Sequence, residues 1–251
     1  MNSPKFTSKA RRLAISSSLT TTGASLLYGP ILLIGLSARS SPLDPVGDPW
    51  LAALETLILV IAPAMAAVVW CIQASSDEAS KPRGAIAFAF MVLAAAITVG
   101  VHLTLLSGPR AAAEAAFRWP SLLYSLEVVA WDVLFAISVL IAAPLVAGGR
   151  LARSIRILLV ISGLLALGGL VGIPTGNMGL RNIGIFGYAA VFPVATAALA
   201  LRFARTAVVA VPQNWLRPGA RTDNLKRRVR LHDKRLTHRP TDLNVHCRQN
   251  P

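Results

Sequence analysis

Residues 121–146 read SLLYSLEVVAWDVLFAISVLIAAPLV, and this stretch decides the fold class. A helix rises about 1.5 Å per residue, so roughly 20 residues cross the hydrocarbon core of a bilayer, which is about 30 Å thick. The stretch is longer than that, and its only charged residues are Glu127 and Asp132. It therefore predicts a membrane-spanning helix.

Five further apolar stretches of comparable length flank it in the chain. They are too long and too continuous to be barrel strands, which alternate over about 10 residues. Helices also satisfy their backbone polar groups internally, as lipid requires. The sequence therefore predicts an all-α fold, a membrane bundle of six transmembrane helices. The six predicted helices cover residues 13–36, 50–72, 85–106, 121–146, 155–173 and 183–203.

The composition agrees, with 54% hydrophobic residues and a mean hydropathy of +0.59. The formal net charge is +14, but twelve of the 25 Lys and Arg residues lie between Arg202 and Arg248. The positive charge is therefore concentrated in the tail, and it does not indicate a nucleic-acid-binding domain. We expect a basic N-terminus (1–12), a transmembrane domain (13–203) and a basic, partly disordered tail (204–251).

The distribution of basic residues predicts that both termini are cytoplasmic. In membrane proteins, the loops on the cytoplasmic side carry an excess of Lys and Arg. The N-terminus and the joints after the second and fourth helices carry nine, whereas the opposite joints carry four. The apolar part of the first helix exceeds the 7–15 residues of a signal-peptide core, so we interpret it as uncleaved. The excess of Arg over Lys is typical of GC-rich bacterial genomes, so we expect a bacterial inner (plasma) membrane.

Ionisable groups inside a membrane are costly and usually functional. Asp132 lies about 18 Å along its helix, near the midplane, and Glu127 lies nearer the outer end. A separation of five residues places these two carboxylates about 140° apart on an α-helix. They are therefore not a catalytic pair, and the helix that carries them needs polar partners on two faces, inside the bundle.

Further polar residues fall at the same, outer ends of other helices: Glu55, His102, Arg181 and Asn182. Our hypothesis is that Glu55, His102, Glu127 and Arg181 meet in one outward-facing polar pocket, with Arg181 neutralising Glu55 or Glu127. Asp132 is the central polar group in this hypothesis, and His102 can titrate near neutral pH. The alternative is that each group reaches the interface or pairs locally for packing.

Gly168, Gly172 and Gly176 repeat every fourth residue and are expected to form one helix face. Such faces allow helices to approach closely. We interpret this face as packing within the chain, with a homo-oligomer interface as the alternative.

The tail segment 222–236 places Leu225, Val229, His232 and Leu236 on one face of a basic helix. Such a helix binds anionic lipid head groups. The alternative is a charged tail without order. The lipid bilayer is the expected main partner, and we do not expect nucleic acid.

WPSLLYSLEVVAWDVLFAISVLIAAP (119–144) and LRNIGIFGYAAVFPVA (180–195) are the most distinctive segments. The region Trp119–Arg202 resembles a group of uncharacterised bacterial multi-pass membrane proteins. The resemblance implies a multi-pass membrane fold and draws attention to Trp131, Asp132, Arg181 and Asn182. It implies no activity.

The leading function hypothesis is a membrane protein that binds or translocates a small solute or ion through a polar site in the bundle. The first alternative is a non-catalytic regulatory or assembly subunit that binds partners or anionic lipid. The second is an intramembrane lipid-modifying enzyme, which the sequence disfavours because it has no HExxH, GxSxG, P-loop or CxxC motif. We expect no cofactor and no metal site.

Overall fold

The computed structural model describes residues 7–40, 46–109 and 119–206. The chain divides into two units, Met1–Val209 and Ala210–Pro251, and the second lies wholly outside the described residues. The predicted tail helix (222–236) therefore has no structural description, and neither do residues 1–6 of the basic N-terminus.

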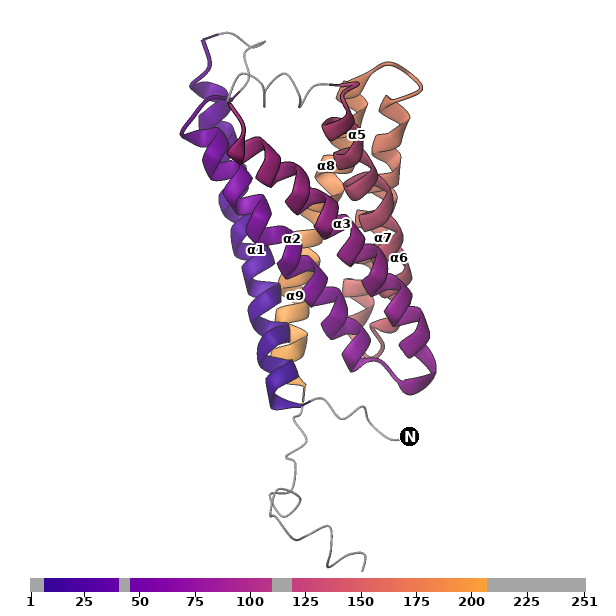
Figure 1. The fold of residues 1–251 in the computed structure, drawn as a ribbon. Helices are drawn as coiled ribbons and strands as arrows, with labels where there is room; N and C mark the ends of the chain where they lie inside the picture. Colours follow the sequence, from indigo (N-terminus) through magenta and orange to yellow (C-terminus); the bar gives the residue numbers. More distant parts are fainter. Residues whose placement is uncertain (1–6, 41–45, 110–118, 207–251) are drawn as a thin grey trace, which may run out of the picture. The chain divides into compact units, whose positions relative to one another are not determined.

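The described residues form an all-α bundle (Figure 1). The first three spans are α1 (Ser8–Ser37), α2 (Trp50–Ser75) and α3 (Lys81–Ser107), the last preceded by the 3₁₀ turn η1 (Glu78–Ser80). The fourth span joins α5 (Leu122–Val128), the π-helix η2 (Val129–Phe135), α6 (Ala136–Ala142) and the 3₁₀ turn η3 (Ala143–Leu145). The fifth is α7 (Arg150–Gly169) with η4 (Leu170–Gly172). The sixth joins η5 (Met178–Arg181), α8 (Asn182–Phe186), the π-helix η6 (Gly187–Val191) and α9 (Phe192–Arg205).

Within the described ranges, six helices are long and apolar enough to cross a membrane, and each of the six predicted stretches falls on one of them. Large apolar side chains are exposed around the bundle, on each of the six spans. Examples are Leu26, Val60, Leu93, Leu164 and Leu201. A helix bundle with an apolar exterior is unusual for a protein dissolved in water.

Consecutive spans run antiparallel, and α9 returns to pack against α1 (Figure 1). Arg11 Nε in the first turns of α1 donates a hydrogen bond to the carbonyl of Phe203 near the end of α9, 3.1 Å away. One end of the bundle therefore contains the start of α1, the α2–α3 and α6–α7 loops and the end of α9. We call it the basic end. Its basic residues are Lys9, Arg11, Arg12, Lys81, Arg83, Arg150, Arg153, Arg156, Arg202 and Arg205.

Short polar side chains mark where these helices begin. Asp48 Oδ1 accepts a hydrogen bond from the amide of Ala52 at 3.2 Å, at the start of α2. The helix itself begins at Trp50, directly after the N-cap residue Pro49. Before α3, Asp77 caps η1 by accepting from the Ser80 amide at 2.8 Å, and hydrogen bonds from Ser80 lower the pKa of this carboxyl.

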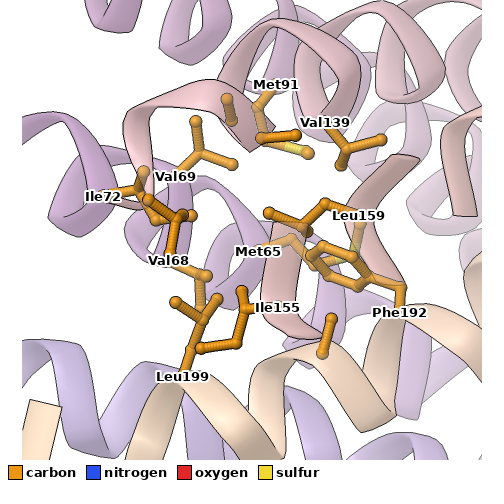
Figure 2. Packing of buried hydrophobic residues seen from close by; sticks show 14 of the residues in the cluster. Met65, Val68, Val69, Ile72, Met91, Val139, Ile155, Leu159, Phe192 and Leu199 are labelled. Atoms are coloured by element: carbon orange, nitrogen blue, oxygen red, sulfur yellow. The ribbon is translucent and has the colours of Figure 1, made fainter. Parts of the chain in front are cut away.

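Buried apolar side chains pack into a hydrophobic core inside the bundle (Figure 2). Apolar side chains from all six spans meet there, among them Val68, Met91, Val139, Leu159 and Leu199. The buried charged residues of the described part lie towards the end of the bundle opposite the basic end.

Close glycine contacts lie between the last two spans. A Cβ on Gly168 would lie 3.4 Å from Ile183, and one on Gly172 would lie 3.2 Å from the amide nitrogen of Arg181. Gly176 lies beyond the α-helix, which ends at Gly169, and has a φ of +64°. A further close approach joins Gly169 and Gly184, where a Cβ on Gly169 would lie 2.9 Å from the Cα of Gly184.

Candidate functional site

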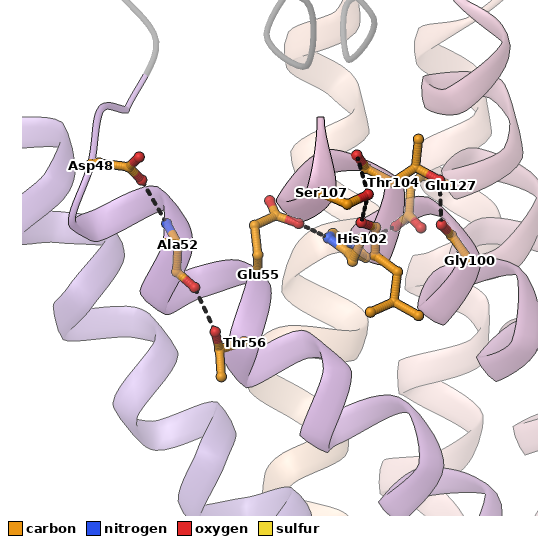
Figure 3. Close-up of polar contacts among 10 residues, drawn as sticks. Asp48, Ala52, Glu55, Thr56, Gly100, His102, Thr104, Ser107 and Glu127 are labelled. Carbon is orange, nitrogen blue, oxygen red and sulfur yellow. Dashed lines mark hydrogen bonds and ion pairs between the residues drawn. The ribbon is translucent and has the colours of Figure 1, made fainter. Parts of the chain in front are cut away.

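His102 on α3 joins two carboxylates from neighbouring helices (Figure 3). Its Nδ1 hydrogen-bonds Glu55 Oε2 of α2, and its Nε2 lies 3.4 Å from Glu127 Oε2 of α5. The three residues are 2–4% exposed. We call these three residues the Glu–His–Glu cluster. Buried charges are tolerated when they are paired in this way.

Asp132 makes a separate ion pair with Arg181. Arg181 Nε donates a hydrogen bond to Asp132 Oδ2 at 3.1 Å, and Asp132 is fully buried. The guanidinium carbon of Arg181 also lies 4.6 Å from the centroid of the Tyr124 ring, a cation–π distance. Our expectation that Arg181 neutralises Glu55 or Glu127 is therefore wrong, because its ion-pair partner is Asp132.

Asp132 lies within the π-helix η2, whereas Glu127 lies in the preceding α5. The 3.6 residues per turn assumed for the angle between them therefore hold for only part of the segment that joins them. The two carboxylates have different partners, His102 for Glu127 and Arg181 for Asp132. Asp132 reaches Arg181, and both Arg181 and Glu127 line the same cavity.

That cavity has a volume of about 380 Å³ and lies in the half of the bundle away from the basic end. Glu55, His102, Glu127 and Arg181 all line it. Most of the remaining wall is apolar and comes from α1, α2 and α3. It includes Leu32, Leu51, Leu54, Ile58, Ile61 and Leu105. Its size falls within the range of small-molecule sites, and a mostly apolar wall with a few polar groups is typical of them.

Aromatic rings separate this cavity from the core. Trp131 on η2 and Tyr188 on η6 both line the cavity, and their ring centroids are 4.8 Å apart. Phe135 and Phe192 pack behind them, with centroids 5.0 Å apart, and are almost fully buried. The two π-helices thus meet at the inner boundary of the cavity, and π-helical turns occur frequently at functional sites.

Two of the predicted site residues lie outside the cavity wall. Asn182 is exposed at the start of α8, and Asp132 lies behind the wall in its ion pair. Sequence reasoning in turn missed Tyr28 and Tyr188, which line the cavity. A tyrosine in an apolar stretch resembles any core aromatic residue, so no sequence signal separated them.

Two carboxylate oxygens are buried without a hydrogen-bond partner among the described residues, Glu127 Oε1 and Asp132 Oδ1. Asp132 Oδ1 points at Gly184, where a Cβ would lie only 2.7 Å away. Glu127 differs because other atoms of this residue line the cavity, although Oε1 itself is buried.

Fold and site together define a class: a bundle of six helices able to span a membrane, with a charged cavity in one half. Comparison with protein-family models, with curated proteins and with solved structures finds no match to this chain.

Proposed function

We propose that this protein is a multi-pass membrane protein that binds a small solute or ion in the cavity and moves it across the membrane. The observation that carries the proposal is the Glu–His–Glu cluster on the wall of a cavity of about 380 Å³. Ionisable groups at such depth are costly, so their presence beside a cavity favours a role in binding.

The site assigns different roles to the two acids of the fourth span. Glu127 faces the cavity and keeps one oxygen without a hydrogen bond. Asp132 is bonded to Arg181 of the sixth span, so it connects two spans rather than contacting the solute. Glu127 therefore replaces Asp132 as the central residue of the proposed site.

We expect a hydrophobic carbodiimide to label Glu127 or Glu55, and not Asp132, as the pH is lowered in lipid. The reagent modifies protonated carboxyls that it can reach in an apolar setting. Glu55 and Glu127 line the cavity, whereas Asp132 is buried behind it and ion-paired. Mass spectrometry of the labelled protein locates the modified residues.

The matched control is Glu78, an acid whose side chain is 88% exposed at the basic end. It should label weakly with the hydrophobic reagent and readily with a water-soluble one. Labelling of Asp132 in preference to Glu127 would contradict the assigned roles. Absence of label at Glu55 and Glu127 at every pH would remove the support for a binding cavity.

We also propose that the basic end faces the cytoplasm, in agreement with the excess of Lys and Arg there. The test uses single cysteines at Gly47 and Glu78, at opposite ends of α2, with Cys71 and Cys247 replaced by alanine. We expect an impermeant maleimide to label Gly47→Cys in intact cells and Glu78→Cys only after permeabilisation. The reverse pattern would invert the orientation.

A regulatory or assembly subunit has less support. Gly169 and Gly184 pack against each other within the chain, so this pair of glycines is not available to a partner. The lipid-binding role of the tail remains a proposal that rests on sequence alone.

A further inference from the structure

The contacts of His102 determine the charge of the Glu–His–Glu cluster. Both ring nitrogens face a carboxylate, Nδ1 in a hydrogen bond to Glu55 and Nε2 at 3.4 Å from Glu127 without a hydrogen bond between them. Two nearby carboxylates favour the imidazolium form of His102, which carries a proton on each nitrogen. With both glutamates ionised, the net charge of the cluster is then −1.

The other charged residues near the cavity do not compensate for this charge. Arg181 lines the cavity, but its guanidinium is bonded to Asp132, and this pair is neutral as a unit. The cluster therefore leaves one negative charge beside the cavity. An uncompensated charge in a low-dielectric interior is costly, so the cavity favours a ligand with one positive charge.

Within the cluster, Glu127 indicates where a cationic group would bind. It is 4% exposed, it lines the cavity, and its Oε1 accepts no hydrogen bond from the described residues. A buried carboxylate oxygen without a donor loses stabilisation that an N–H group of a ligand restores. Charge-assisted bonds of this kind are about twice as strong as neutral ones.

The rest of the wall argues for a ligand with an apolar body. A water molecule takes up about 30 Å³ in the liquid, so a bare ion would leave most of the cavity to water against apolar walls. Leu51, Ile58 and Leu105 offer no hydrogen bonds. The rings of Tyr28, Trp131 and Tyr188 provide faces that attract an organic cation.

A metal ion fits the donor set poorly. Both nitrogens of His102 are already directed at carboxylates, so neither is available as a ligand. No group of three or more potential ligands with metal-binding geometry occurs among the described residues. A divalent ion would also exceed the single negative charge of the cluster.

We propose that the cavity binds a monovalent organic cation, with its ammonium group at Glu127 and its apolar body against the leucine and aromatic walls. This proposal deepens the proposed function and rests on it, because it names the ligand class of the same cavity.

The test is protection of Glu127 from carbodiimide by phenethylammonium, using the full-length protein in lipid. At about ten times its Kd, such a ligand leaves roughly one site in eleven open, so the labelling rate should fall about tenfold. Two molecules of similar shape serve as controls, neutral 2-phenylethanol and anionic phenylacetate, and sodium chloride at equal concentration controls for ionic strength. None of the three should protect.

A second measurement compares variants by thermal stability. Phenethylammonium should raise the Tm of the wild type and of Glu78→Gln, which removes an exposed acid far from the cavity. It should not raise the Tm of Glu127→Gln or Glu55→Gln, in which the cluster loses its negative charge. The protection assay needs no variant, so it decides the question even if a variant fails to fold.

Equal protection by 2-phenylethanol, by phenylacetate or by sodium would overturn the organic-cation proposal. So would labelling of Glu127 that phenethylammonium leaves unchanged, an outcome in which the binding cavity itself still stands. If Glu127 and Glu55 do not label at any pH even without a probe, the proposed function fails together with the ligand class.

Discussion

Asp132→Ala is expected to lower the free energy of unfolding by about 3–5 kcal/mol, because it leaves the charge of Arg181 buried without a carboxylate. Arg181 is only 7% exposed, so water replaces the lost carboxylate incompletely. The contact with the Tyr124 ring remains but does not neutralise the charge. Unfolding of the purified protein in mixed micelles, followed by circular dichroism, measures the loss.

The control is the exposed ion pair of Lys81 and Glu78, whose charged atoms are 2.8 Å apart. Exposed pairs typically contribute less than about 1 kcal/mol, so Glu78→Ala should have a small effect. The double variant Asp132→Asn, Arg181→Gln should recover part of the loss, because it leaves no buried charge. Equal effects of Asp132→Ala and Glu78→Ala would show that the buried pair does not hold the spans together.

This expectation changes how an inactive Asp132 variant is interpreted. From sequence alone, loss of transport in Asp132→Asn indicates a central binding residue. In the structure, Asp132 connects η2 to η5 and does not line the cavity. A loss of activity in this variant therefore has to be compared with its stability, whereas Glu127→Gln tests the binding site directly.

The sequence was sufficient for the spans and for the depth of the polar residues. Hydropathy and length locate a helix that crosses a membrane, because lipid requires about 20 apolar residues and an internally bonded backbone. Depth along each helix then placed Glu55, His102 and Glu127 at the same level. That they line one cavity depends on the packing of α2, α3 and α5, which no periodicity in the sequence specifies.

The partners of Asp132 could not be predicted, for a local reason. The derivation assumed α-helical geometry, but residues 129–135 form a π-helix, which changes the face on which Asp132 lies. Nothing in VAWDVLF signals this change, because π-turns are stabilised by tertiary contacts. The end of the fifth span could not be predicted either: Gly168 and Gly172 lie against residues of the sixth span, but Gly176 lies in the turn beyond the helix.

Gly184→Ala is expected to destabilise the protein by about 1–3 kcal/mol, although alanine is the better helix former. The added methyl group would lie 2.7 Å from Asp132 Oδ1, 3.2 Å from the carbonyl oxygen of Ala166 and 3.3 Å from the Cα of Gly169. Two of these neighbours are backbone atoms, and the third belongs to a carboxylate that Arg181 holds in place. None of them is the mobile end of a flexible side chain, so α8 itself has to shift.

Gly100→Ala is the matched control, because Gly100 is an exposed glycine within α3 with no atom within 4 Å of an added Cβ. There the substitution should stabilise the protein by up to about 1 kcal/mol, since only the helix propensity changes. The two variants should therefore shift the unfolding midpoint in opposite directions in the same assay. Stabilisation by Gly184→Ala would mean that the fifth and sixth spans do not approach at Gly169 and Gly184. The ion pair of Asp132 and Arg181 would then lose the close packing that keeps it buried.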